Sequence, residues 1–229
     1  MSGLDARRLL RRARSAALAT ALADGTPYAS LVTVACDVDA SPILLFSNLS
    51  DHTRNLARDP RASLLIEAAS RRHNPQTGPR VSLVGRVGRA DDPRLKRRFL
   101  ARHPDASLYA DFADFNIYRF DADRAHLVAG FGRADWLDAA DVILAPSGVD
   151  GLADTEEEIL RHLNGPLAKV VDRAAERLGH SGDGWSVIAV DGDGVDLRRG
   201  RALGRLDLAP PLRNAADVEE GLRLAAAGG

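Results

Sequence analysis

Cysteine is almost absent from this 229-residue chain, which contains a single one, Cys36. One cysteine cannot form an internal disulfide, which fits either a reducing compartment or simply a cysteine-poor sequence. The sequence also lacks an uninterrupted apolar run of the roughly 18 residues that a membrane-spanning helix needs. We therefore expect a cytoplasmic protein with no membrane partner.

One segment near the start has the order of a secretory signal peptide. The stretch RRLLRRARSAALATALA contains arginines, a short apolar run and an Ala-x-Ala site. A strand-turn-strand pattern runs across that site, so we favour a first helix followed by a strand.

An excess of positive charge is missing as well. The 31 Lys and Arg residues are balanced by 32 Asp and Glu residues, which leaves a formal net charge of −1. Because nucleic-acid-binding domains usually carry a basic excess, we expect no nucleic-acid partner.

Motifs of common catalytic sites are also absent. None of the six histidines lies in a His-x-His or His-x-x-His arrangement, so a zinc site is not expected. A serine nucleophile elbow, a Walker loop and a paired-glycine Rossmann motif are missing too. An enzyme with this sequence would therefore need a cofactor that carries the reactivity. Haem needs only one axial histidine, so the sequence leaves it open.

What the chain does contain is a dense series of strand patterns up to about residue 145. Short apolar or alternating runs, separated by turn residues, predict strands at residues 17–22, 28–36, 42–47, 61–69, 80–89, 116–120 and 124–132. Short helices are predicted at residues 4–14, at 52–58 and from Pro93, where Asp92 is the expected cap. A small antiparallel barrel satisfies this pattern, because closure removes exposed sheet edges.

The composition changes after the turn-forming segment APSG at residues 145–148. The later sequence predicts a helix at residues 154–179, a hairpin at 185–198 and a final helix. The expected fold is therefore α+β, mainly β, with a barrel domain at residues 1–145 and a small α+β domain at 149–229.

Hydrogen-bond donors are crowded where the third predicted strand meets a helix. In SNLSDHTRNL, Ser47 and Asn48 end the strand, and His52, Thr53 and Arg54 begin the helix. Backbone N–H groups at a helix start attract anions, and arginine can bind two phosphate oxygens at once. A phosphate monoester fits this set; an ordinary helix cap with exposed polar residues is the alternative, and the spacing leaves both open.

A second candidate segment is HLVAGFGRADWL, which follows a predicted strand. It brings Phe131, Arg133 and Trp136 together, with a glycine on either side of Phe131. Glycines permit close backbone approach to a flat ligand. An ordinary glycine-rich strand end explains the segment equally well.

Several of these segments resemble a known family. GTPYASLVTVA, SNLSDHTRNLARDPRASLL, PRVSLVGRV and RFLARHPDASLYADFADFNIYRFDADRAHLVAGFGRADWL resemble, in this order, the pyridoxamine 5′-phosphate oxidase-like FMN-binding split barrels. The branch they resemble most is the HugZ-like haem-utilisation group, whose barrel is often followed by a small α+β domain. The resemblance implies an antiparallel split β-barrel and a homodimer with two cofactor sites at the subunit interface, the cofactor being FMN or, as the alternative, haem.

The resemblance also implies positions for the cofactor contacts. The segment Ser30, Leu31, Val32 and Thr33 would border the flavin ring, and Ser47, Asn48, His52, Thr53 and Arg54 would bind the phosphate. Arg80 falls where the oxidases have a flavin-contacting glutamine, and Arg133 falls near an arginine of their substrate pocket. The tail departs from the HugZ-like pattern, because Gly165, Pro166 and Leu167 stand where that group has acidic residues and a second histidine.

Three functions compete on this basis. The first is a flavin-dependent oxidoreductase, or at least an FMN-binding protein, whose small-molecule substrate the sequence does not name. The second is a haem-binding or haem-degrading protein, in which His126 or His162 would be the candidate iron ligand. The third is a non-enzymatic regulatory module that uses the barrel dimer as an interaction scaffold.

Overall fold

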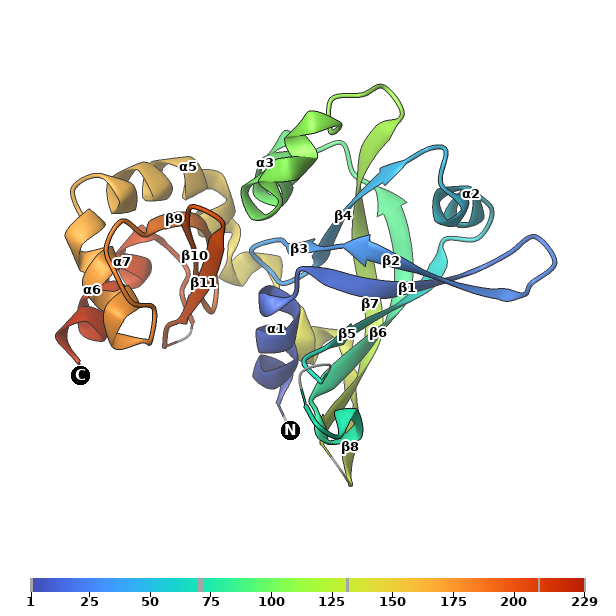
Figure 1. Cartoon of the computed structure of the whole chain (residues 1–229), viewed down its shortest axis with the longest axis horizontal. Helices are drawn as coiled ribbons and strands as arrows, with labels where there is room; N and C mark the ends of the chain where they lie inside the picture. Colours follow the sequence, from blue (N-terminus) through green and yellow to red (C-terminus); the bar gives the residue numbers. More distant parts are fainter. Residues whose placement is uncertain (1, 70–71, 131, 210, 229) are drawn as a thin grey trace. The chain divides into compact units, whose positions relative to one another are not determined.

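Two units, Met1–Ile143 and Leu144–Gly229, make up the chain (Figure 1). The structure is a computed structural model, and it describes residues 2–69, 72–130, 132–209 and 211–228. Within these ranges no helix has both the length and the apolar character required to cross a membrane.

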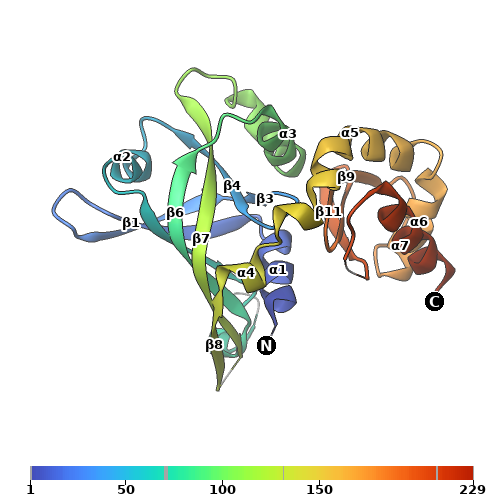
Figure 2. The ribbon, with the colours of Figure 1, turned by 180° about the vertical axis from the view of Figure 1, so that it is seen from behind.

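The first unit is built on one curled antiparallel sheet, which Figure 2 presents from behind. The strand order is β2-β1-β5-β6-β7-β4-β3, and β8 pairs with β7. The strands are β1 (Ser15–Ala21), β2 (Pro27–Thr33), β3 (Ala35–Cys36), β4 (Pro42–Ser47), β5 (Arg61–Glu67), β6 (Arg80–Arg89), β7 (Phe115–Gly130) and β8 (Arg133–Asp138). This arrangement confirms the predicted antiparallel split barrel.

Short helices surround the sheet, and local capping explains where they begin. They are α1 (Gly3–Arg12), α2 (Asp51–Arg58), α3 (Pro93–Arg102) and α4 (Ala139–Val142), with 3-10 turns at Pro75–Thr77 and Pro104–Leu108. Ser2 and Asp5 form a capping box at α1. Asp92 accepts a hydrogen bond from the Arg94 backbone N–H at 2.8 Å, as its predicted role as a cap requires.

The core lies on the concave side of the curled sheet. Leu18, Leu64, Leu83 and Phe120 are all fully buried there. Because strand side chains alternate between the two faces, the neighbours of these residues point away from the core. Helix α3 covers part of this second face, where Leu95 and Phe99 pack on Ile43, Leu45 and Ile117, and the part on β1, β2, β5 and β8 is left for function.

Two predicted strands, at residues 116–120 and 124–132, are in fact the single strand β7. The acidic stretch between them reads as a turn, but the strand bends there and continues. Its pairing register with β6 shifts between Val84 and Gly85. A Cβ atom at Gly85 would lie 2.0 Å from the Asp121 backbone oxygen, so glycine is required where the two strands approach. Strand β8 is an addition that the sequence pattern did not indicate.

The second unit is an α+β fold with a three-stranded sheet in the order β11-β10-β9. Its elements are α5 (Asp150–Asn164), α6 (Ala168–Arg177), β9 (Ser186–Asp191), β10 (Gly194–Arg199), β11 (Ala202–Asp207) and α7 (Ala215–Ala227), with a 3-10 turn at Pro146–Gly148. The predicted single helix at 154–179 is wrong: it divides between α5 and α6 at Gly165 and Pro166. Proline lacks the N–H that a continuous helix needs.

Candidate functional site

A continuous row of side chains crosses the outer face of the barrel sheet. Cα pairing connects its members strand by strand, from β2 through β1, β5, β6 and β7 to β8. In this order the members are Leu31, Ala17, Leu65, Ser82, His126 and Trp136. We call this set the outer row. Leu31 and Trp136, at its two ends, are 81% and 57% exposed, so both keep large apolar surfaces in contact with water.

One half of the outer row lies in a surface cavity of about 530 Å³. We call it the outer groove, and define it by Arg12, Arg14, Ala17, Leu31, Leu65 and Glu67. Its floor is apolar, whereas two guanidinium groups and one carboxylate stand at its edge. An apolar floor with a few charged groups at its rim is the usual character of a small-molecule site.

The other half of the outer row ends in an aromatic cluster. The His126 and Trp136 ring centroids are 4.8 Å apart, and the Arg124 guanidinium carbon lies 4.6 Å from the Trp136 centroid. His126 is half-buried. This packing orients an imidazole on the same face as the outer groove, with only Ser82 between it and Leu65 in the register.

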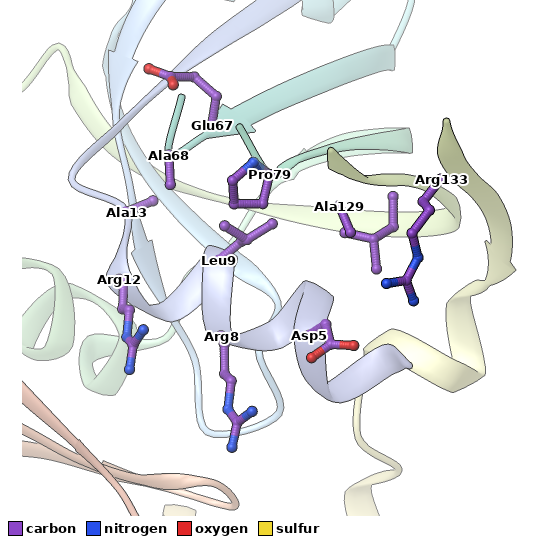
Figure 3. Close-up of a pocket in the computed structure, with 11 residues that line it drawn as sticks. Asp5, Arg8, Leu9, Arg12, Ala13, Glu67, Ala68, Pro79, Ala129 and Arg133 are labelled. Atoms are coloured by element: carbon purple, nitrogen blue, oxygen red, sulfur yellow. The ribbon is translucent and has the colours of Figure 1, made fainter. Parts of the chain in front are cut away.

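A second cavity, of about 490 Å³, lies between α1 and the ends of β5, β7 and β8 (Figure 3). We call it the helix cavity, and define it by Arg8, Leu9, Pro79, Leu127, Ala129 and Arg133. Leu9 and Pro79 lie close to one another at its centre, and Arg133 reaches from β8 toward α1 (Figure 3). Arg12, Ala13, Glu67 and Ala68 line both cavities, so the two are neighbours.

The four predicted flavin-ring contacts on β2 divide between the two faces of the sheet. Val32 is buried in the core, and Ser30 points to the same side. Leu31 and Thr33 are exposed on the outer face. The Ser30 hydroxyl lies 3.3 Å from Nδ1 of His52, which brings two of the predicted residues together.

At the end of β4, two further predicted residues are held by the chain itself. The Ser47 hydroxyl donates a hydrogen bond to the Asp114 carboxylate. The Asn48 side-chain oxygen accepts a hydrogen bond of 3.0 Å from the Asn116 amide. These contacts fix the turn before α2.

The first turn of α2 carries the remaining predicted phosphate contacts. Thr53 is buried, and its hydroxyl lies 2.7 Å from the Ser50 hydroxyl. Arg54 is exposed and donates to the Asp51 carboxylate at 3.3 Å. Burial lowers the pKa of His52, which favours its neutral form. Asp51 lies in the first turn of α2, so its carboxylate already places a negative charge at this helix start.

The last predicted residues lie in different surroundings. The Arg80 guanidinium donates to the backbone oxygens of Gln76 and Gly78, each at 3.3 Å, so it fastens the loop before β6. Arg133 lines the helix cavity. Phe131 lies outside the described residues. His162 belongs to the second unit, where its Nε2 atom is 3.1 Å from the Glu219 carboxylate.

Sequence reasoning did not identify the arginines at the edge of the outer groove, Arg12 and Arg14. Their only signal was the arginine-rich first helix. It also did not connect Leu31 with Leu65, because nothing local relates two residues that are more than thirty positions apart in the sequence.

Comparisons with known proteins extend these observations. A family model described as "CREG, beta-barrel" matches residues 4–142. The chain is 38% identical over 114 residues to "Non-canonical heme oxygenase HOZ, chloroplastic" of Arabidopsis thaliana. That match covers 48% of this chain and 34% of the relative, so this chain spans about a third of the relative's length.

Two solved structures match nearly the whole chain. The protein Atu2129 from Agrobacterium tumefaciens has a TM-score of 0.80 at 28% identity, over 96% of this chain and 93% of that one. A heme binding protein from Mycobacterium smegmatis has a TM-score of 0.60 at 28% identity, over 100% of this chain and 97% of that one.

Proposed function

The chain belongs to the CREG β-barrel family, and from that premise we propose that its barrel unit binds haem on the outer face of the sheet. The observation that carries this proposal is the outer row, which joins an arginine-edged apolar groove to a half-buried histidine. The names of two relatives agree with it: the Arabidopsis protein is called a heme oxygenase and the Mycobacterium protein a heme binding protein.

The residues present fit the chemistry of haem. The macrocycle is flat and apolar, and its two propionates are anionic. Leu31, Leu65 and Trp136 supply apolar surface, while Arg12 and Arg14 supply guanidinium groups that suit carboxylates. Neighbouring strands are about 4.8 Å apart, so His126 on β7 stands roughly 10 Å from Leu65 on β5, two strands away.

His126 is the residue we propose as the iron ligand. Its ring is supported by Trp136, and it is presented on the face that carries the groove. His162, the other candidate from the sequence, pairs with Glu219 in the second unit and has no part in the outer row. Bound haem supplies redox and oxygen chemistry, whereas the chain supplies the imidazole, the apolar surface and the guanidinium groups. Haem degradation is the finer proposal; because it consumes dioxygen as well as electrons, loss of the Soret band when a reductant is added in air, but not under nitrogen, tests it.

We also propose that the chain forms a homodimer through this face. Leu31 and Trp136 leave large apolar areas in contact with water, which is typical of an interaction surface. A second copy packed there would exclude water from the open side of the ligand. Light scattering at micromolar concentration tests this, and a monomeric mass in both the free and the haem-loaded state would contradict it.

FMN is the alternative cofactor, and the α2 start gives it less support. A phosphate bound there would have to compete with the Asp51 carboxylate for Arg54, and it would meet the negative charge of Asp51 in the first turn of α2. The Thr53 hydroxyl is likewise engaged with Ser50. Two alternatives to the haem proposal therefore remain. One is an FMN-dependent oxidoreductase, and the other is a regulatory module that binds no cofactor.

Titration of the purified protein with haem and with FMN tests the proposal. We expect a Soret shift that saturates at one haem per chain. His126→Ala should abolish the shift, whereas the matched variant His162→Ala should leave it unchanged. Saturable binding of FMN without haem binding would favour the oxidoreductase, and binding of neither cofactor would favour the regulatory module.

A further inference from the structure

We propose that the helix cavity is a second binding site, separate from the haem site, and that its ligand is a small amphipathic carboxylate. The apolar part of the ligand would lie against Leu9, Pro79 and Ala129, and its carboxylate would meet Arg133. This inference does not depend on haem binding, because these four residues line the helix cavity and not the outer groove.

The space arises from side-chain size. Helix α1 lies over the end of the sheet, and several residues that line the cavity are small: Ala13, Ala68 and Ala129. Leu9 is only half-buried although it faces Pro79, so the apolar surfaces are not fully packed (Figure 3). The resulting volume of about 490 Å³ is in the usual range of small-molecule sites.

The two carboxylates of the cavity are already engaged by the chain. Asp5 accepts hydrogen bonds from the Ser2 backbone N–H at 3.0 Å and from the Ser2 hydroxyl at 3.1 Å. These bonds lower the pKa of Asp5 and keep it ionised as part of the α1 capping box. Glu67 accepts a hydrogen bond from the Ala69 backbone N–H. Neither carboxylate therefore needs a cationic ligand.

The cations of the cavity outnumber its carboxylates, since Arg8, Arg12 and Arg133 line it as well. Arg8 and Arg12 project from α1 on the side away from Pro79 (Figure 3). Arg133 comes from the opposite wall, is exposed, and extends toward α1 (Figure 3). A guanidinium next to an apolar floor selects a ligand with one carboxylate and one apolar part, because its two parallel N–H groups match a carboxylate.

Calorimetric titration with octanoate tests this site in the full-length protein. We expect saturable binding of octanoate, with much weaker binding of octan-1-ol, which has no charge, and of octylammonium, whose charge is reversed. Arg133→Gln should weaken octanoate binding by about 10- to 150-fold, the range for one charge-assisted hydrogen bond. Ala129→Phe, at an exposed position of the wall, should block the cavity, and circular dichroism checks that this variant is folded.

Arg14→Gln is the matched control, because Arg14 lines only the outer groove. Arg14→Gln should weaken haem binding and leave octanoate binding unchanged. Arg133→Gln should weaken octanoate binding and leave haem binding unchanged. Three results would overturn the proposal: no saturable octanoate binding by the wild type, equal binding of octan-1-ol, or equal loss of octanoate affinity in the two arginine variants. If the protein does not bind haem, the octanoate titrations still test the helix cavity, because they do not involve the haem site.

Discussion

Removing the Leu31 side chain should separate ligand binding from folding. Leu31 is 81% exposed in the single chain, so its truncation to alanine removes little that stabilises the fold of one chain. If haem covers the outer groove, the same side chain becomes buried on binding. Burying a leucine completely is worth about 1.5–3 kcal/mol, and four-fifths of that is about 1.2–2.4 kcal/mol.

This free energy corresponds to a loss of haem affinity of about 7- to 50-fold for Leu31→Ala, since about 1.4 kcal/mol is a tenfold change. The affinity is measured from the Soret band during haem titration at constant protein concentration. Thermal unfolding of the haem-free protein should give a Tm within about a degree of the wild type, because exposed substitutions change stability little.

Leu49→Ala is the matched control for this prediction. Leu49 is 70% exposed, but it lies in the turn between β4 and α2 and not in the outer row. Equal haem affinities for the two variants would refute the argument, because they would show that haem does not cover Leu31. A large fall in the Tm of Leu31→Ala alone would instead reveal a structural role for that side chain.

Three further predictions, one of them with a matched control variant, test other parts of the structure. Arg54→Ala should leave haem affinity unchanged. If the phosphate of FMN binds there instead, a fluorescence titration will show FMN affinity lowered about 10- to 150-fold, whereas the affinity for riboflavin, which has no phosphate, will not change. Burial lowers the pKa of His52 from its usual 6.5, so the unfolded chain binds the proton more readily and stability is lost as the pH falls through 6.5. His52→Phe should flatten that pH dependence in urea unfolding. Gly85→Ala, whose new Cβ would meet the Asp121 oxygen, should destabilise the fold by about 1–3 kcal/mol. Gly88→Ala, with no atom within 4 Å of its new Cβ, should be tolerated, and equal unfolding midpoints for the two glycine variants would contradict the packing argument.

Local chemistry was sufficient to predict several elements of this fold. The strands at residues 42–47 and 80–89 have the bounds that their apolar and alternating patterns indicate. Asp92 and Pro93 begin α3 because a side-chain acceptor and a fixed φ angle act within one turn. A glycine inside a strand is typical of a bulge or of a close backbone approach, and Gly85 shows both. The resemblance to split barrels then supplied the topology that these local patterns left open.

Elements whose stability depends on distant partners were not predictable in this way. The long strand β7 passes through an acidic stretch that resembles a turn, and its pairing with β6 keeps it extended. Strand β11 carries an arginine at a buried position, Arg205, which tolerates burial because Asp191, Asp196 and Asp207 surround it. A single-sequence pattern records the polarity of such a residue but not its partners.

The candidate site shows the same division. The order of residues along each strand already sets which side chains share a face with Leu31 or with His126, because side chains alternate between the two faces. That these faces form one surface follows from the folded sheet alone, because the register of five strand pairs connects them. A shift of one residue in any of these pairs would turn one part of the outer row into the core. The burial of the opposite faces fixes that register, and it therefore brings the arginine-edged groove and the histidine onto one surface.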